Sequence, residues 1–168
     1  GITAADIATM ICKVGEGTVH RLWEPLDQKL RPPTAYGAKF SGPYCIAVGL
    51  IDSAAGLAQF TDAKVNDPTV QALSDKITYE IDPENEYPQN YTGHIRATLH
   101  DGRVIEAFQP HLRGGTHDPM TRDQITIKAR ANFAYGGMAP DRAEAMIKLC
   151  SDLRALPDLS GFAALRGA

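Results

Sequence analysis

The sequence is poor in positive charge, in aromatic residues and in long apolar runs. Its 168 residues carry 17 Lys and Arg against 20 Asp and Glu, which leaves a formal net charge of −3 at pH 7. Domains that bind nucleic acid present a basic face, so this balance argues against a nucleic acid partner. No apolar run approaches the ~20 residues that cross a bilayer, so the sequence predicts no membrane partner either.

Cysteine is also scarce. Cys12, Cys45 and Cys150 are scattered along the chain, with no CxxC pair and no metal-site spacing. An odd number of isolated thiols suits a reducing compartment, so we expect a cytoplasmic protein. The sequence also lacks a phosphate-binding glycine loop, a dinucleotide fingerprint and a GxSxG nucleophile motif. These absences argue against nucleotide chemistry and against a structural metal ion.

Alternating residues predict the β segments. Residues 7–14 are largely apolar on both faces, which is typical of a central strand, and residues 78–81 form a short second one. Residues 94–100 alternate almost strictly, Asp101-Gly102 supplies a hairpin turn, and residues 103–108 return. That register points three apolar side chains at a helical layer: Ile95, Ala97 and Leu99.

Helix signals lie between and after these strands. Residues 15–43 carry repeated Gly and Pro, which predicts a long loop without extended regular structure. Pro43 suits the first turn of a helix that continues to about Ala55. Asp67 and Pro68 together start another helix. For the helix that follows Pro43, we expect a buried side made of Ile46, Leu50 and Ile51.

The last part of the chain reads as helical. Thr121 with Gln124 has the spacing of a capping box, and Asp141 is a candidate cap for a helix to about Leu156. The sequence therefore predicts an α+β fold, a two-layer sandwich in which helices cover a small antiparallel or mixed sheet. We expect an α+β domain over residues 1–119 and a helical segment over residues 120–168.

The turn from Lys39 to Tyr44 is the first candidate site. It lies at the mouth of an apolar helix, where backbone N–H groups can face an anion. Ser41, the Gly42 amide and Tyr44 could hold a carboxylate together, with Lys39 adding positive charge. A tyrosine hydroxyl can also donate a proton. In the alternative reading, Ser41 only caps the helix and Tyr44 packs in the core.

A second candidate is the polar loop 110–119. Arg113 and the Gly114-Gly115 bend could bind an anion through the guanidinium and backbone N–H groups. His111 and His117 could ligate a metal ion, but no carboxylate or third histidine has supporting spacing. An ordinary solvated loop has the same composition.

The order of these segments resembles the C-terminal part of the MmgE/PrpD family. The similarity rests on Lys39-Phe40-Ser41 followed by Pro43-Tyr44, on residues 1–7, and on Asp118–Thr121. Family members include 2-methylcitrate dehydratases, cis-aconitate decarboxylases and iminodisuccinate epimerases. They run to more than twice this length and carry a helical domain that this sequence lacks, so we expect the chain to be a C-terminal fragment.

The resemblance implies a lid and substrate-binding part of an enzyme that acts on small polycarboxylates. Such an enzyme abstracts a proton alpha to a carboxylate, as a lyase or an isomerase, without a cofactor. The resemblance implies that Tyr44 is the catalytic residue in this chain. It also implies that most acid–base residues lie in the missing N-terminal helical domain, so the fragment alone should be inactive. Lys39, Ser41, Gly42 and Arg113 would bind the substrate, and we expect a homodimer. The sequence leaves the polycarboxylate and the reaction type open.

A non-enzymatic α+β module that binds a ligand or a partner is the alternative. Its apolar helices would then form an oligomer interface, and exposed apolar patches at a domain boundary would look the same.

Overall fold

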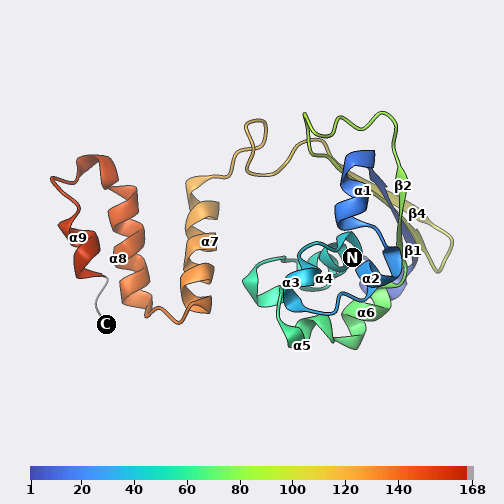
Figure 1. Ribbon diagram of the computed structural model, residues 1–168, viewed down its shortest axis with the longest axis horizontal. Coiled ribbons are helices and arrows are strands. Elements are labelled where there is room, and N and C mark those ends of the chain that lie inside the picture. Colours follow the sequence, from blue (N-terminus) through green and yellow to red (C-terminus); the bar gives the residue numbers. More distant parts are fainter. Residues whose placement is uncertain (166–168) are drawn as a thin grey trace. The chain divides into compact units, whose positions relative to one another are not determined.

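The computed structural model describes residues 1–165 and divides the chain into two units (Figure 1). The first unit is Gly1–Asp118, and the second begins at Pro119. The first holds a sheet with its helices, and the second is helical throughout its regular structure.

A four-stranded mixed sheet organises the first unit, in the order β2-β1-β3-β4. β1 pairs in parallel with β2, through Met10 opposite Ile77, and antiparallel with β3, through Met10 opposite Ala97. The parallel pair requires a long crossover, and the chain between β1 and β2 supplies it with the helices of this unit. The strands are β1 (Ile7–Val14), β2 (Ile77–Ile81), β3 (Gly93–Leu99) and β4 (Val104–Gln109).

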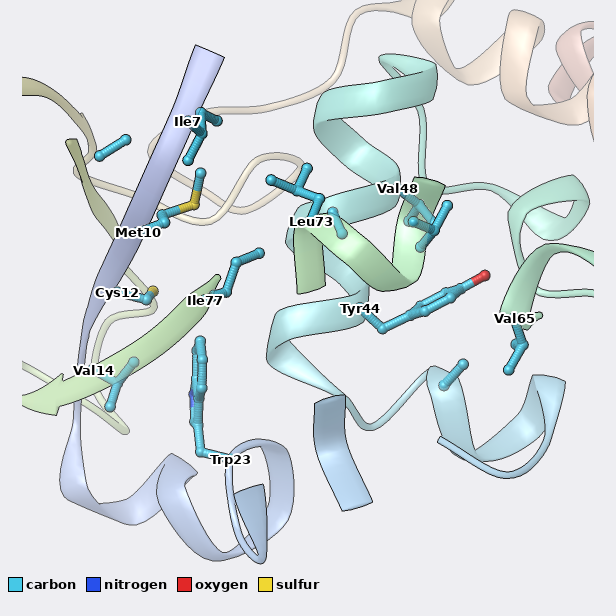
Figure 2. Close-up of a cluster of buried hydrophobic side chains, with 14 of the residues drawn as sticks. Ile7, Met10, Cys12, Val14, Trp23, Tyr44, Val48, Val65, Leu73 and Ile77 are labelled. Carbon is cyan, nitrogen blue, oxygen red and sulfur yellow. The ribbon is translucent and has the colours of Figure 1, made fainter. Parts of the chain in front are cut away.

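One face of the sheet, called here the inner face, is buried against the helices. Because side chains alternate along a strand, the register places every second residue on it, apart from a shift in β1 between Ile7 and Thr9. Figure 2 shows strand side chains such as Met10 and Ile77 in one cluster with Leu73 of the helical layer. The buried strand residues on this face include Met10, Cys12, Val14, Ile77, Ala97 and Leu99.

The opposite, outer face carries charges. Lys13 and Arg96 approach Glu80 at 3.8 and 3.9 Å, and His94 Nε2 lies 2.6 Å from Glu106. One apolar and one polar face are the pattern of a sheet covered on one side only. The structure thus confirms the α+β fold and, with Leu99 buried and His100 exposed, the predicted hairpin.

The helical layer of the first unit is built from short elements. They are η1 (Ala4–Asp6), α1 (Glu16–Leu22), α2 (Leu26–Leu30), α3 (Ala35–Ala38), α4 (Gly42–Asp52), η2 (Leu57–Gln59), α5 (Asp62–Val65) and α6 (Pro68–Ser74), where η marks a 3₁₀ helix. The expectation of a long loop over residues 15–43 was wrong, since α1, α2 and α3 lie there. The Gly and Pro residues limit the length of these helices without preventing them.

The buried side of α4 also differs from the prediction. Tyr44, Ala47 and Val48 are the residues of its interior that are fully buried, whereas Leu50 is 38 % exposed. Ile46 and Ile51 are only half-buried. The helix packs against α6, and its small Ala47 is fully buried, in a position where a larger aliphatic side chain would need more room.

The second unit consists of α7 (Arg122–Tyr135), α8 (Pro140–Ser151), η3 (Leu153–Ala155) and α9 (Ser160–Ala164). Thr121 and Gln124 form the predicted capping box at the start of α7. Asp141 is not the cap of α8 as expected, because the helix already begins at Pro140 and places Asp141 in its first turn. Arg130 and Glu144 join α7 to α8 through two hydrogen bonds of 2.5 and 2.9 Å.

Candidate functional site

The turn before α4 is held by the side chain of Ser41, which is fully buried. Its hydroxyl donates to the carbonyl of Lys29 at 2.5 Å and accepts a hydrogen bond from the Tyr44 amide at 3.0 Å. The second contact makes Ser41 the N-cap of α4. Both hydrogen bonds link parts of this chain, so the hydroxyl occupies a structural position.

Gly42 is required by the close approach of Trp23. A Cβ atom at position 42 would lie 2.6 Å from the indole ring, well inside contact distance. Trp23 is itself 3 % exposed and packs against Tyr79 with ring centroids 5.3 Å apart. The glycine therefore lets the end of α1, α4 and the sheet share one core.

Tyr44 points into the same core, as Figure 2 shows, and is 1 % exposed. Its hydroxyl donates to the carbonyl of Gln59 at 2.5 Å, and its ring lies 5.8 Å from that of Phe60. Burial raises the pKa of this hydroxyl, with a smaller opposing effect from Lys64. A buried hydroxyl with a satisfied donor is the arrangement expected of a core tyrosine.

Lys39 is the member of this turn that faces solvent. Its ammonium lies 5.8 Å from the ring centroid of Tyr36, which is 70 % exposed. At that distance a cation–π contact contributes little at an exposed site. Lys39 thus keeps its hydrogen-bond donors accessible, in contrast to its neighbours Ser41 and Tyr44.

A charged network that the sequence analysis missed lies beside Tyr44. Lys64 Nζ contacts Asp52 at 2.9 Å and Asp67 at 3.2 Å, and Gln59 Nε2 donates to Asp52 at 3.1 Å. The hydrogen bond from Lys64 lowers the pKa of Asp52, and the pKa of Lys64 is raised by the same pair. Only the i,i+3 spacing of Lys64 and Asp67 is visible in the sequence, because Asp52 is brought near by folding.

Arg113 lies on the loop after β4 and is exposed. Among the hydrogen bonds and ion pairs of residues 1–165, none joins it to the Lys39–Tyr44 turn. The structure therefore brings Lys39, Ser41, Gly42 and Tyr44 onto one turn and leaves Arg113 on a separate loop.

The two histidines of this loop lie together. The rings of His111 and His117 have centroids 4.9 Å apart, and His111 Nδ1 is 3.4 Å from Asn90 Oδ1. Asn90 in turn donates to Glu86 at 2.7 Å. Two shallow cavities of about 480 and 280 Å³ border this pair. Within the part of the chain that the structure describes, no group of three or more His, Cys, Asp or Glu side chains could hold a metal ion.

An apolar groove of about 460 Å³ lies between α4 and the inner face of β3 and β4. The helix contributes Ile46, Gly49 and Leu50, which explains why apolar residues of α4 stay partly exposed. The other residues that line the groove are Ile2, Ile7, Met10, Ile95, Ala97, Ile105, Glu106 and Ala107. Its surface is almost entirely apolar, so it suits an apolar partner better than a carboxylate.

Comparison with known proteins identifies the family. A family model described as the MmgE/PrpD C-terminal domain matches residues 1–153, most of the chain. None of the curated proteins compared matches it. Among residues 1–165, no helix has the length and the apolar character needed to cross a bilayer. The chain therefore belongs to the MmgE/PrpD family of generally dehydratase-like enzymes, of which it carries the C-terminal domain.

Proposed function

We propose that this chain is the lid and substrate-binding part of an enzyme that acts on small polycarboxylates. The reaction is proton abstraction alpha to a carboxylate, followed by dehydration, decarboxylation or epimerisation. The family match over residues 1–153 is the observation that carries the proposal. The acid and base that such a reaction needs come, in this proposal, from a helical domain outside the sequence.

The contribution of this chain is electrostatic. Developing and resident negative charges on a polycarboxylate need cations or N–H donors aimed at them. Lys39 is exposed at the turn before α4, and Arg113 is exposed on the loop after β4, so both are free to meet a substrate carboxylate. Ser41 and Gly42 support this by holding the turn in shape, through the cap of α4 and the contact with Trp23.

A catalytic role for Tyr44 has weaker support. Its ring is buried and its proton is donated to the Gln59 carbonyl, so the hydroxyl would have to exchange that partner for a substrate atom. In the proposed enzyme, Tyr44 therefore stabilises the core. Its hydroxyl can reach the substrate only if its hydrogen bond to the Gln59 carbonyl is broken.

The experiment that tests the proposal compares the full-length protein with this chain. Both are incubated with 2-methylcitrate, cis-aconitate and iminodisuccinate, and turnover is followed by proton NMR. We expect the full-length protein to convert one of the three and the 168-residue chain to convert none. Turnover by the isolated chain would show that the active site had been misplaced, and an inactive full-length protein would count against the reaction class.

The apolar groove supports a second candidate function, a module that binds a partner without catalysis. Its lining of Ile46, Leu50 and Ile105 offers no group for acid–base chemistry. A full-length protein that is folded, inactive on all three substrates and bound to a partner through this groove would favour that alternative.

A further inference from the structure

Two histidines lie at the ends of the loop that follows β4. His111 comes near its start and His117 directly before Asp118, and the centroids of the two imidazole rings are 4.9 Å apart. His111 is half-buried, whereas His117 is exposed. Imidazole nitrogens are common protein ligands of Zn²⁺, Ni²⁺ and Cu²⁺. The pair is therefore a candidate metal site away from the turn before α4.

Hydrogen bonds close this loop and hold its two ends together. The side-chain amide of Gln109 donates to the carbonyl of His111 at 2.9 Å and to the carboxylate of Asp118 at 3.1 Å. The backbone amide of Gly114 donates to the carbonyl of Asp118 at 2.6 Å. The two rings are thus brought close by the fold itself, and little conformational freedom remains to be lost when both bind one ion.

Asn90 determines which nitrogen of His111 is available. Its amide nitrogen donates to Glu86 at 2.7 Å and to the carbonyl of Pro110 at 2.9 Å, so its oxygen is the atom that faces His111 Nδ1, at 3.4 Å. An amide oxygen only accepts hydrogen bonds, so in the neutral ring Nδ1 carries the hydrogen and Nε2 keeps its lone pair. Metal-binding histidines are oriented in this way, by a hydrogen bond from the ring nitrogen that does not bind the metal.

The ring of His117 is held less tightly. Within residues 1–165, no hydrogen bond or ion pair involves its nitrogens, and its described contact is the one with the ring of His111. A neutral histidine always has one nitrogen with a free lone pair. His117 can therefore turn that nitrogen toward an ion beside His111 without breaking a hydrogen bond of the fold.

The separation of the two rings fits a shared ion. Metal–nitrogen bonds are about 2.0–2.1 Å long, and an imidazole nitrogen lies about 1.2 Å from the centre of its ring. Two imidazoles that bind one ion at an angle between about 90° and 109° then have ring centres about 4.5–5.2 Å apart. The 4.9 Å between His111 and His117 lies inside this range.

We propose that His111 and His117 bind one divalent transition-metal ion and that Asn90 orients His111 for it. This inference is independent of the proposed enzymatic function. In the described part of the chain, residues 1–165, no group of three or more His, Cys, Asp or Glu side chains could hold a metal ion, so water completes the coordination. The cavities of about 480 and 280 Å³ that border both rings have room for this water and give the ion a path from solvent.

The charges around the two rings are mixed. The carboxylates of Glu86 and Asp118 belong to the two loops that hold the site, and both favour a cation. Arg113 lies between the histidines in the sequence and opposes a cation, but its side chain is exposed, so solvent and salt screen its charge. A pair of imidazoles completed by water suits Zn²⁺ or Ni²⁺ better than Mg²⁺, which prefers oxygen ligands.

Isothermal titration calorimetry of the whole chain with zinc chloride tests the site. We expect saturable binding of one Zn²⁺ per chain. Asn90→Ala should weaken this binding ~10–100-fold, as the loss of a residue that orients a metal ligand does. His111→Ala and His117→Ala should each weaken it by more than ~100-fold, because each removes one of the two protein ligands themselves.

Three variants are matched controls. Gln89→Ala removes a side chain that borders both cavities and, within residues 1–165, has no hydrogen bond to either histidine. His100→Ala removes an exposed histidine from the hairpin, and Cys150→Ser removes an exposed thiol. All three should bind Zn²⁺ as tightly as the unmutated chain does.

NMR spectra of the histidine side chains follow the same site without any substitution. Before Zn²⁺ is added, His111 should carry its hydrogen on Nδ1, and the ring signals of His111 and His117 should shift together during the titration. The proposal is overturned if the chain shows no saturable Zn²⁺ binding, or if binding survives both histidine variants while these ring signals stay unchanged. Equal affinities of Asn90→Ala and Gln89→Ala would overturn the orienting role of Asn90.

Discussion

The hydroxyl of Tyr44 donates to the carbonyl oxygen of Gln59 at 2.5 Å and so fastens η2 to α4. The side chain of Gln59 continues the link, because its amide donates to Asp52 at the end of α4. Lys64 contacts Asp52 in turn. These contacts hold together the segment between α4 and α5, which has little regular structure of its own.

Tyr44→Phe should lower the stability of the isolated chain by about 1 kcal/mol, because it removes the donor to the partly buried Gln59 carbonyl. The melting temperature should fall by about 2–4 °C, measured by circular dichroism. In the full-length enzyme, a loss of ~10²-fold or more in kcat at an unchanged melting temperature would instead establish Tyr44 as a catalytic donor.

Gly42→Ala should destabilise the chain by about 1–3 kcal/mol, because the added methyl group collides with Trp23 in a packed core. Gly49→Ala is the matched control within α4. Nothing lies within 4 Å of a Cβ atom at that position, so the alanine should stabilise the helix by up to about 1 kcal/mol. Urea unfolding followed by Trp23 fluorescence measures both, and equal effects would refute the close-approach argument.

Lys64→Met should cost about 1 kcal/mol at neutral pH, since it removes the cation shared by Asp52 and Asp67. The pKa of Asp52 is lowered from its ordinary value of 3.8 in the folded chain. The contribution of ionised Asp52 to the free energy of unfolding is therefore present above pH 3.8 and is lost as the pH falls through the folded-state pKa. The stability difference between the two proteins should shrink below pH 3.8, measured by urea unfolding across that range.

Lys148→Met is the control for that experiment. Lys148 also pairs with a carboxylate, that of Asp152 at 2.7 Å, but its side chain is 79 % exposed. The substitution should have a smaller effect at neutral pH. If the difference in free energy of unfolding between Lys64→Met and the unmutated chain stays constant below pH 3.8, the ion pairs are excluded as its cause.

The strands could be predicted because their signals are local. Strict alternation in residues 94–100 leaves two choices of face, and Asp101-Gly102 fixes the turn, with Gly102 at φ +85°. The central position of β1 followed from its two apolar faces. Alternation does not show whether two paired strands run parallel or antiparallel. The sequence therefore predicted an antiparallel or mixed sheet, and the structure shows that β2 is parallel to β1.

The buried side of α4 could not be predicted in the same way. Ile46 and Leu50 are the more hydrophobic choice, yet they line the groove while Ala47 is fully buried. Burial follows the shape of the partner surface as well as hydrophobicity, and a close helix contact favours a small residue. The sequence does not show which side of α4 packs against α6.

The candidate site shows a similar division. The sequence placed Ser41 at a helix cap, and the cap is present. It could not show that the hydroxyls of Ser41 and Tyr44 donate to Lys29 and Gln59. Both acceptors are backbone carbonyls, which every residue type has, so the residue types at positions 29 and 59 give no signal. The exposure of Lys39 beside buried neighbours is likewise a product of packing.

Lys39→Gln should weaken substrate binding by the full-length enzyme without affecting its fold. Lys39 is exposed, and its described contact is a distant cation–π approach to Tyr36, so the melting temperature should not change. If the ammonium meets a substrate carboxylate, its loss should raise KM by ~10-fold or more, as expected for a hydrogen bond to a charged group. The kcat value should stay within about two-fold, because a carboxylate held equally in the ground and transition states affects binding alone. Steady-state kinetics with whichever polycarboxylate the enzyme converts measures both constants, and Lys148→Gln provides an exposed lysine on α8 as the control. An unchanged KM would remove Lys39 from the site and leave Arg113 as the exposed cation still to be tested in the same way.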